Sequence, residues 1–151
     1  MPNYNIDKIY MNIANEISKM SYAKRLQVGA IIVKDNSIIA YGYNGMPTGF
    51  DNSCEFNNIT NPEVLHAESN AIAKIAKSNI SSDNASVYVT TSPCLECSKL
   101  LIQSGIKNVY FYNLYRNIDG LKLLLKANVN VFQYMENNTN FFEIYKIKNE
   151  S

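Results

Sequence analysis

Apolar residues near the start of the chain recur at helical spacing and predict an opening amphipathic helix. They are Ile6, Ile9, Tyr10, Ile13, Ile17 and Met20. Two apolar runs follow, Val28 to Val33 and Ile38 to Tyr43, on either side of the polar sequence KDNS. This pattern predicts a hairpin of two strands. The Gly- and Asn-rich segment 44–61 then predicts one long loop, and loops of that length are usually functional or mobile.

Two later helices are each predicted by a cap residue followed by proline. Asn61 before Pro62 predicts a helix that continues to about Lys77. Ser92 before Pro93 predicts another, which a glycine at position 105 ends.

Strands and helices alternate through the rest of the chain. The pattern predicts strands over 86–91, 108–113 and 129–134 and a helix over 119–126, whereas 141–148 is ambiguous between strand and helix. Such alternation is typical of a layered α/β fold with a largely parallel sheet. We find no internal repeat or linker, so residues 1–151 are expected to form a single domain.

The composition excludes several classes of partner. The chain has 151 residues, 46% hydrophobic and 18% charged, with a net charge of +1. This charge creates no global field that would gather nucleic acid or an anionic membrane, and no basic groove accompanies the eleven tyrosines. No apolar run is long enough to cross a bilayer, and the first residues show no signal-peptide pattern, so we expect a cytoplasmic protein.

The three cysteines indicate metal or redox chemistry. They are Cys54, Cys94 and Cys97. An odd number, with two of them in a C-x-x-C pattern, argues against a disulfide framework.

Two short segments carry the candidate chemistry: His66-Ala67-Glu68, and the sequence PCLEC that contains Cys94 and Cys97. A zinc ion with three protein ligands keeps its fourth position for water, and the one histidine with the two cysteines would supply that set. Both cysteines are predicted near a helix N-terminus, where the dipole stabilises thiolate. The carboxylate of Glu68 could take a proton from the water and pass it to the substrate.

Each element alone has a less specific interpretation. A single histidine is more often a core or surface residue, and a single C-x-x-C could be redox-active or half of a structural site. A redox motif does not explain a glutamate two residues after the histidine. A structural zinc would need a fourth ligand, for which Cys54 is the one candidate. We therefore predict one catalytic zinc per chain and interpret Cys54 as a loop or packing thiol.

The H-x-E and P-C-x-x-C motifs form the signature of zinc nucleoside and base deaminases. Together with the GYNG-x-P-x-G sequence of residues 42–49, they make the chain resemble the deoxycytidylate (dCMP) deaminases of the cytidine deaminase superfamily from about Tyr22 to Tyr134. The resemblance implies a three-layer fold whose central sheet has five strands, mixed but mostly parallel. It also implies zinc-dependent hydrolysis of dCMP to dUMP and ammonia, for thymidylate synthesis.

The resemblance further implies the substrate contacts. Arg25 and Arg116, the two arginines of the chain, become candidates for the phosphate together with Tyr115, because arginine binds phosphate bidentately. Asn44 would contact the deoxyribose. Solvated surface charge and, for Asn44, a turn position are the alternatives. The carbonyl of Ala67 and backbone groups near Ser92 are candidates for orienting the substrate amine.

Several members of the resembled family are hexamers that dCTP activates and dTTP inhibits, with Mg²⁺ at the nucleotide. By resemblance, the regulatory nucleotide would lie against Gly42, Asn44, Gly45 and Gly49. Glycines there would let backbone N–H groups approach a triphosphate. We accordingly expect a homo-oligomer, either a hexamer or a dimer.

Two rival functions stay open. The chain could deaminate another substrate, such as tRNA adenosine, a free base or dCTP, although its near-neutral charge and the short tail IKNES argue against tRNA. Alternatively it could be a catalytically silent, zinc-stabilised nucleotide-binding module. The presence of Glu68 argues against the silent module, because a structural site does not need that carboxylate.

Overall fold

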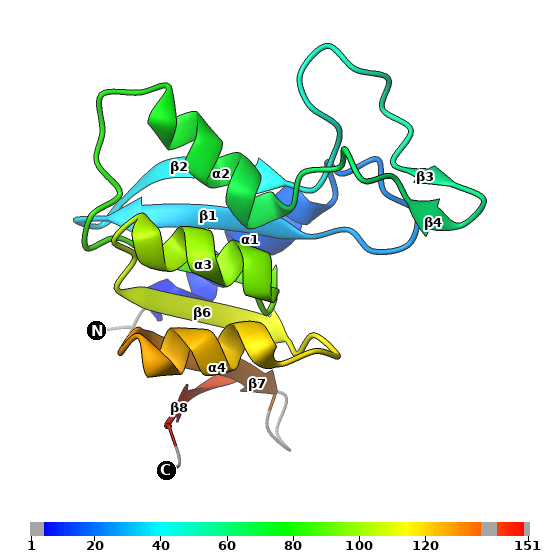
Figure 1. Ribbon diagram of the computed structural model, residues 1–151. Helices are drawn as coiled ribbons and strands as arrows, with labels where there is room; N and C mark the ends of the chain where they lie inside the picture. The colour runs from blue at the N-terminus through cyan, green and yellow to red at the C-terminus, as the bar shows by residue number, and fades with distance from the viewer. Residues whose placement is uncertain (1–4, 137–141, 150–151) are drawn as a thin grey trace.

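The computed structural model describes residues 5–136 and 142–149 of the chain (Figure 1). A six-stranded sheet has the strand order β2-β1-β5-β6-β7-β8, and a separate two-stranded sheet is formed by β3 and β4. The elements are α1 (Ile6–Ser18), β1 (Gly29–Lys34), β2 (Ser37–Tyr43), β3 (Glu55–Phe56), β4 (Ile59–Thr60), α2 (Ala67–Ala76), β5 (Ser86–Thr91), α3 (Leu95–Gln103), β6 (Asn108–Asn113), α4 (Asp119–Lys126), β7 (Asn130–Glu136) and β8 (Phe142–Ile147).

The sheet lies between two helical layers. In Figure 1, α2, α3 and α4 lie on the near side of the sheet and α1 lies behind it. Side chains alternate between the two faces along each strand. On β5, Val87 and Val89 pack in the core beneath α2, α3 and α4, whereas Tyr88 belongs to the cluster around α1. The predicted layered α/β fold is confirmed.

The sheet differs from the expected one in its strand count. It has six strands rather than five, because the segment with the ambiguous pattern forms β8 and pairs with β7. The pairings of β5 with β6 and of β6 with β7 are parallel, whereas the other three pairings are antiparallel, so the sheet is mixed as expected but not mostly parallel. Because β5 and β6 run parallel, the residues that follow each of them lie at the same edge of the sheet.

Two helices begin later than their cap signals predicted. Helix α2 begins at Ala67, not at Asn61 or Pro62, because Leu65 is held extended by backbone hydrogen bonds to Gly45 in both directions, at 3.1 and 2.8 Å. Helix α3 begins at Leu95, two residues after Pro93.

The predicted end of α3 is confirmed. Gly105 has a φ of +79°, and its N–H donates to Ile102 while the next N–H donates to Leu101. This pair of bonds is a Schellman motif, in which glycine avoids the strain of left-handed backbone.

The segment predicted as one long loop contains the hairpin of β3 and β4. Asn57 and Asn58 form its turn with φ values of +52° and +63°, a conformation that asparagine tolerates better than most residues. Figure 1 shows this hairpin projecting beyond the ends of β1 and β2, away from the main sheet. Within the described parts of the chain, no helix combines the length and apolar character needed to cross a membrane.

Candidate active site

Three potential metal ligands meet at the N-termini of two helices. His66 is the N-cap residue of α2, Cys94 is the N-cap residue of α3, and Cys97 lies in the first turn of α3. The Nδ1 atom of His66 lies 3.4 Å from the sulfur of each cysteine. Roughly 2.3 Å Zn–S and 2.0 Å Zn–N bonds in a tetrahedron separate sulfur from nitrogen by about 3.5 Å. The three side chains therefore fit a tetrahedral zinc ion. The sequence interpretation had His66 within a helix, whereas it precedes the first turn.

The protonation of the two sulfurs is coupled. Hydrogen bonds, first with Cys97 and then with His66, lower the pKa of the Cys94 thiol to about 4. The same bond with Cys94, together with burial, raises the pKa of Cys97. Hydrogen bonding to Cys94 also raises the pKa of His66. The three groups thus hold protons between them, and a divalent cation would displace these protons on binding.

Glu68 lies in the first turn of α2 and is 5% exposed. Burial raises the pKa of its carboxyl group to about 7, and the negative charge of Cys94 contributes in the same direction. A cation held by the three ligands would lower this pKa again. Without a bound cation, a carboxyl group with this pKa can both accept and donate a proton near neutral pH, as proton transfer in a hydrolytic reaction requires.

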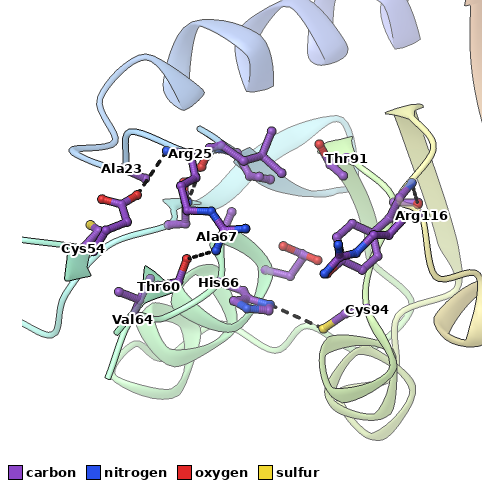
Figure 2. A pocket seen from close by; sticks show the side chains of 17 residues that line it. Ala23, Arg25, Cys54, Thr60, Val64, His66, Ala67, Thr91, Cys94 and Arg116 are labelled. Carbon is purple, nitrogen blue, oxygen red and sulfur yellow. Dashed lines mark hydrogen bonds between the residues drawn. The ribbon is translucent and has the colours of Figure 1, made fainter. Parts of the chain in front are cut away.

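One cavity of about 410 Å³ is lined by two of the three potential metal ligands and by both arginines of the chain. His66, Glu68 and Cys94 line it on the side of α2 and α3. In Figure 2, Arg25 and Arg116 enter the cavity from different walls. Among the described residues, neither arginine forms an ion pair: the two salt bridges found there both join lysines to glutamates.

The structure brings all six predicted substrate-binding residues to this cavity: Arg25, Asn44, Ala67, Ser92, Tyr115 and Arg116. Two of them have side chains engaged with the backbone. Asn44 accepts a hydrogen bond from the Val28 N–H at 2.8 Å and donates one to the Leu26 carbonyl at 2.7 Å. Ser92 Oγ accepts the N–H of Tyr115 at 2.7 Å.

The three glycines proposed for a regulatory nucleotide do not line this cavity. Gly42 is buried beneath α2, where a Cβ atom would lie 2.3 Å from the carbonyl oxygen of Ala67. Gly45 is buried and paired with Leu65. Gly49 is exposed in the loop with a φ of +89°. The absence of a side chain at Gly42 therefore serves the packing of α2 on β2.

Sequence reasoning missed the contribution of the β3–β4 hairpin to the cavity. Glu55 and Thr60 line the wall of the cavity near Arg25. The one local sequence signal for the hairpin that carries them is the pair of asparagines in its turn. Cys54, directly before the hairpin, is 2% exposed and lies outside the set of described residues that could share a metal ion. This burial agrees with its interpretation as a packing thiol.

Residues 4–113 match the family model of the cytidine and deoxycytidylate deaminase zinc-binding region. The chain belongs to this deaminase family. Its fold is similar to that of the dCMP deaminase from cyanophage S-TIM5, solved in complex with dCMP and dUMP, with a TM-score of 0.84 and 46% identity over 88% of this chain and 99% of that chain.

Other members of the deaminase family are longer than this chain. ComE operon protein 2 of Bacillus subtilis is 38% identical over 114 residues, which are 73% of this chain and 60% of that protein. Deoxycytidylate deaminase of Schizosaccharomyces pombe is 33% identical over 150 residues, which are 90% of this chain and 46% of that protein. The chain thus spans about half the length of these curated relatives.

Proposed function

We propose that this chain hydrolyses dCMP to dUMP and ammonia with one zinc ion held by His66, Cys94 and Cys97. The observation that carries this proposal is the position of both arginines on the cavity that His66, Cys94 and Glu68 also line. Two guanidinium groups that form no ion pair among the described residues, both beside a hydrolytic centre, suit a substrate that carries a dianionic phosphate. The similarity to a phage enzyme solved with dCMP and dUMP supports the same substrate.

The proton transfers of the reaction would belong to Glu68. When bound, zinc supplies a Lewis acid that makes water nucleophilic near neutral pH. Glu68 would take a proton from the attacking water and deliver it to N3 of the pyrimidine. As the C4–N bond breaks, the same carboxyl group would pass the second proton to the leaving amine. The products are dUMP and ammonia, so the atoms balance with one water consumed.

The remaining residues would orient the nucleotide. Ala67 and Ser92 lie on the cavity wall close to the metal ligands. The Ser92 carbonyl could accept a hydrogen bond from the substrate amine, whereas the Ala67 carbonyl oxygen lies against Gly42 in the packing of α2 on β2. Arg25, Tyr115 and Arg116 would bind the phosphate. Asn44 would contribute mainly by holding residues 26–28 in place, since its amide already makes two backbone hydrogen bonds.

The decisive test is the loss of absorbance when the purified protein is incubated with dCMP, with and without a zinc chelator. Conversion to dUMP that the chelator abolishes, with little activity on deoxycytidine, supports both the zinc mechanism and the phosphate requirement. If dCMP is not converted even when dCTP and Mg²⁺ are added, the substrate is another base.

Regulation, assembly and compartment stay predictions. We propose a homo-oligomer, hexamer or dimer, in the cytoplasm, with dCTP and dTTP acting near the loop that begins at Asn44 and Mg²⁺ bound with the nucleotide. The exposed Gly49 and the adjoining loop are the accessible part of this segment. Saturation curves for dCMP with and without dCTP test the regulation: identical curves would exclude it.

A further inference from the structure

Arg25 lies in a segment that depends on other parts of the chain for its shape. Residues 21–28 connect α1 to β1 without regular secondary structure. On one side of Arg25, the Asn44 amide holds Leu26 and Val28. On the other side, the carboxylate oxygen Oε1 of Glu55 accepts the N–H groups of Lys24 at 2.8 Å and of Arg25 itself at 3.2 Å. The backbone at Arg25 is therefore fixed from both directions.

The same hairpin also holds the Arg25 side chain. The hydroxyl of Thr60 accepts a hydrogen bond from Nη1 of the guanidinium at 3.4 Å, as the dashed line in Figure 2 shows. Glu55 and Thr60 are directly opposite each other in the β3–β4 pairing, so their side chains share one face of the hairpin. One residue of this pair binds the backbone of Arg25, and the other binds its charged end.

Within the described part of the chain, the apolar tip of the hairpin contributes little to the core. Its two central apolar side chains, Phe56 and Ile59, are 72% and 69% exposed, so they add almost nothing to the core. The base of the hairpin is closed by Asn61, whose N–H donates to Cys54 at 2.8 Å and whose side chain donates to Ser53 at 2.9 Å. The bonds at the base close the hairpin on itself, and its apolar face is exposed. The hairpin is therefore connected to the cavity mainly through the hydrogen bonds of Glu55 and Thr60 with residues 24 and 25.

The charge arrangement favours an anion at Arg25. The Glu55 carboxylate accepts hydrogen bonds from backbone N–H groups, and within the described residues it forms no ion pair with the guanidinium. Thr60 is a neutral partner, so it orients the guanidinium without neutralising it. An arginine held in place without a carboxylate partner is prepared to bind a phosphate bidentately at a low cost in side-chain entropy.

We propose that Glu55 and Thr60 are positioning residues that aim Arg25 at the 5′-phosphate and thereby set the preference for nucleoside monophosphates over nucleosides. This inference rests on the proposed function, because it assigns the phosphate to the wall formed by Arg25. Neither residue touches the reacting atoms: both act through Arg25.

The test compares ligands that differ by the phosphate alone. Binding of dUMP and of deoxyuridine is measured by calorimetry, and kcat/KM is measured for dCMP and deoxycytidine. Thr60→Val removes the hydroxyl that accepts from the Arg25 guanidinium while keeping the shape of the side chain. Glu55→Ala removes the carboxylate that accepts the N–H groups of residues 24 and 25. We expect either change to weaken dUMP binding and kcat/KM for dCMP by roughly five- to twentyfold, with the phosphate-free ligands unchanged within about twofold.

Conservative variants separate positioning from folding. Thr60→Ser keeps a hydroxyl acceptor and Glu55→Gln keeps a carbonyl acceptor, so both should restore most of the dUMP affinity. Glu63→Ala is the matched control, because Glu63 is exposed and lies outside the cavity. It should leave dUMP binding unchanged.

Three outcomes would overturn the inference: equal losses for ligands with and without phosphate, no loss in either variant, or a wild-type protein that binds dUMP no better than deoxyuridine. The proposed function is decided separately by wild-type turnover of dCMP. A protein that prefers dUMP and loses this preference in Thr60→Val and Glu55→Ala, yet does not deaminate dCMP, would support the positioning role and refute the reaction.

Discussion

Gly120 and Cys94 lie so close together that residue 120 has no room for a side chain. A Cβ atom at that position would lie 2.7 Å from the carbonyl oxygen of Cys94 and 2.2 Å from that of Pro93. The first turn of α4 thus packs directly on the backbone that leads into α3. Because Cys94 caps α3 and Cys97 follows in its first turn, this contact controls where both sulfurs lie.

Gly120→Ala is therefore expected to weaken zinc binding and to destabilise the fold. The added methyl group must push the backbone of residues 93 and 94 away, and overpacking of this kind costs about 1–3 kcal/mol. Zinc content after dialysis against a weak chelator and urea unfolding measure the two effects. Gly45→Ala is the control, because the nearest atoms to a Cβ there are 3.9 Å away. Wild-type zinc retention and stability in Gly120→Ala would contradict the prediction.

The sequence predicted the residues of the site better than it predicted their local structure. His66, Glu68 and the two cysteines were selected by their chemistry, which does not depend on the helix boundary. The predicted start of α2 was wrong because Leu65 pairs with Gly45. These residues are twenty positions apart, and such a contact produces no periodic pattern in the sequence.

The hairpin beside Arg25 could not be predicted for a related reason. Its strands have two residues each, too few to show an alternation of apolar and polar positions. The hydrogen bonds that tie Glu55 to residues 24 and 25 span about thirty positions. Asn57 and Asn58 were the one local signal, since consecutive asparagines favour the left-handed backbone of a tight turn. Contacts between residues this far apart in the sequence form only once the sheet has folded, so no local pattern predicts them.

Glu68→Gln should abolish turnover without removing the metal. The amide has nearly the same shape as the carboxylate but cannot shuttle protons, so we expect kcat to fall by roughly 10²–10⁴-fold. Zinc content should stay at the wild-type level, because Glu68 lies outside the set of side chains that could share the ion. Single-turnover assays with dCMP and metal analysis of the same sample check both statements. Loss of zinc would instead make Glu68 a ligand or a structural residue.

The metal stoichiometry depends on which cysteine is replaced. We expect one zinc per chain in the wild-type protein and in Cys54→Ser, because Cys54 does not approach the ligand set. Cys97→Ser should reduce the zinc content to near zero after dialysis, since a hydroxyl is a far weaker zinc ligand than a thiolate. Elemental analysis of the three proteins at equal concentration provides the measurement. Two zinc ions per wild-type chain, or zinc lost in Cys54→Ser, would show that Cys54 is a ligand.

The loop that carries Tyr115 and Arg116 is tied to the end of β5 by one side chain. Ser92 is buried, and its hydroxyl accepts the Tyr115 N–H at 2.7 Å. Ser92→Ala removes this acceptor but keeps the backbone carbonyl, so it separates the support of the loop from any contact of the carbonyl with the substrate amine. We expect KM for dCMP to rise about fivefold, the equivalent of ~1 kcal/mol for one lost hydrogen bond, with kcat nearly unchanged.

Deoxycytidine provides the comparison for Ser92→Ala, because without a phosphate it gains nothing from a correctly placed Arg116. Its kcat/KM should therefore be the same in the variant as in the wild-type protein. Ser104→Ala, which removes a hydroxyl bonded to the Leu100 carbonyl at the end of α3, is the matched control and should leave kcat/KM for both substrates unchanged. If Ser92→Ala lowered kcat for both substrates instead, the hydroxyl would support the reaction centre rather than the phosphate wall. The preference for a phosphate would then depend on Arg25 and its hairpin.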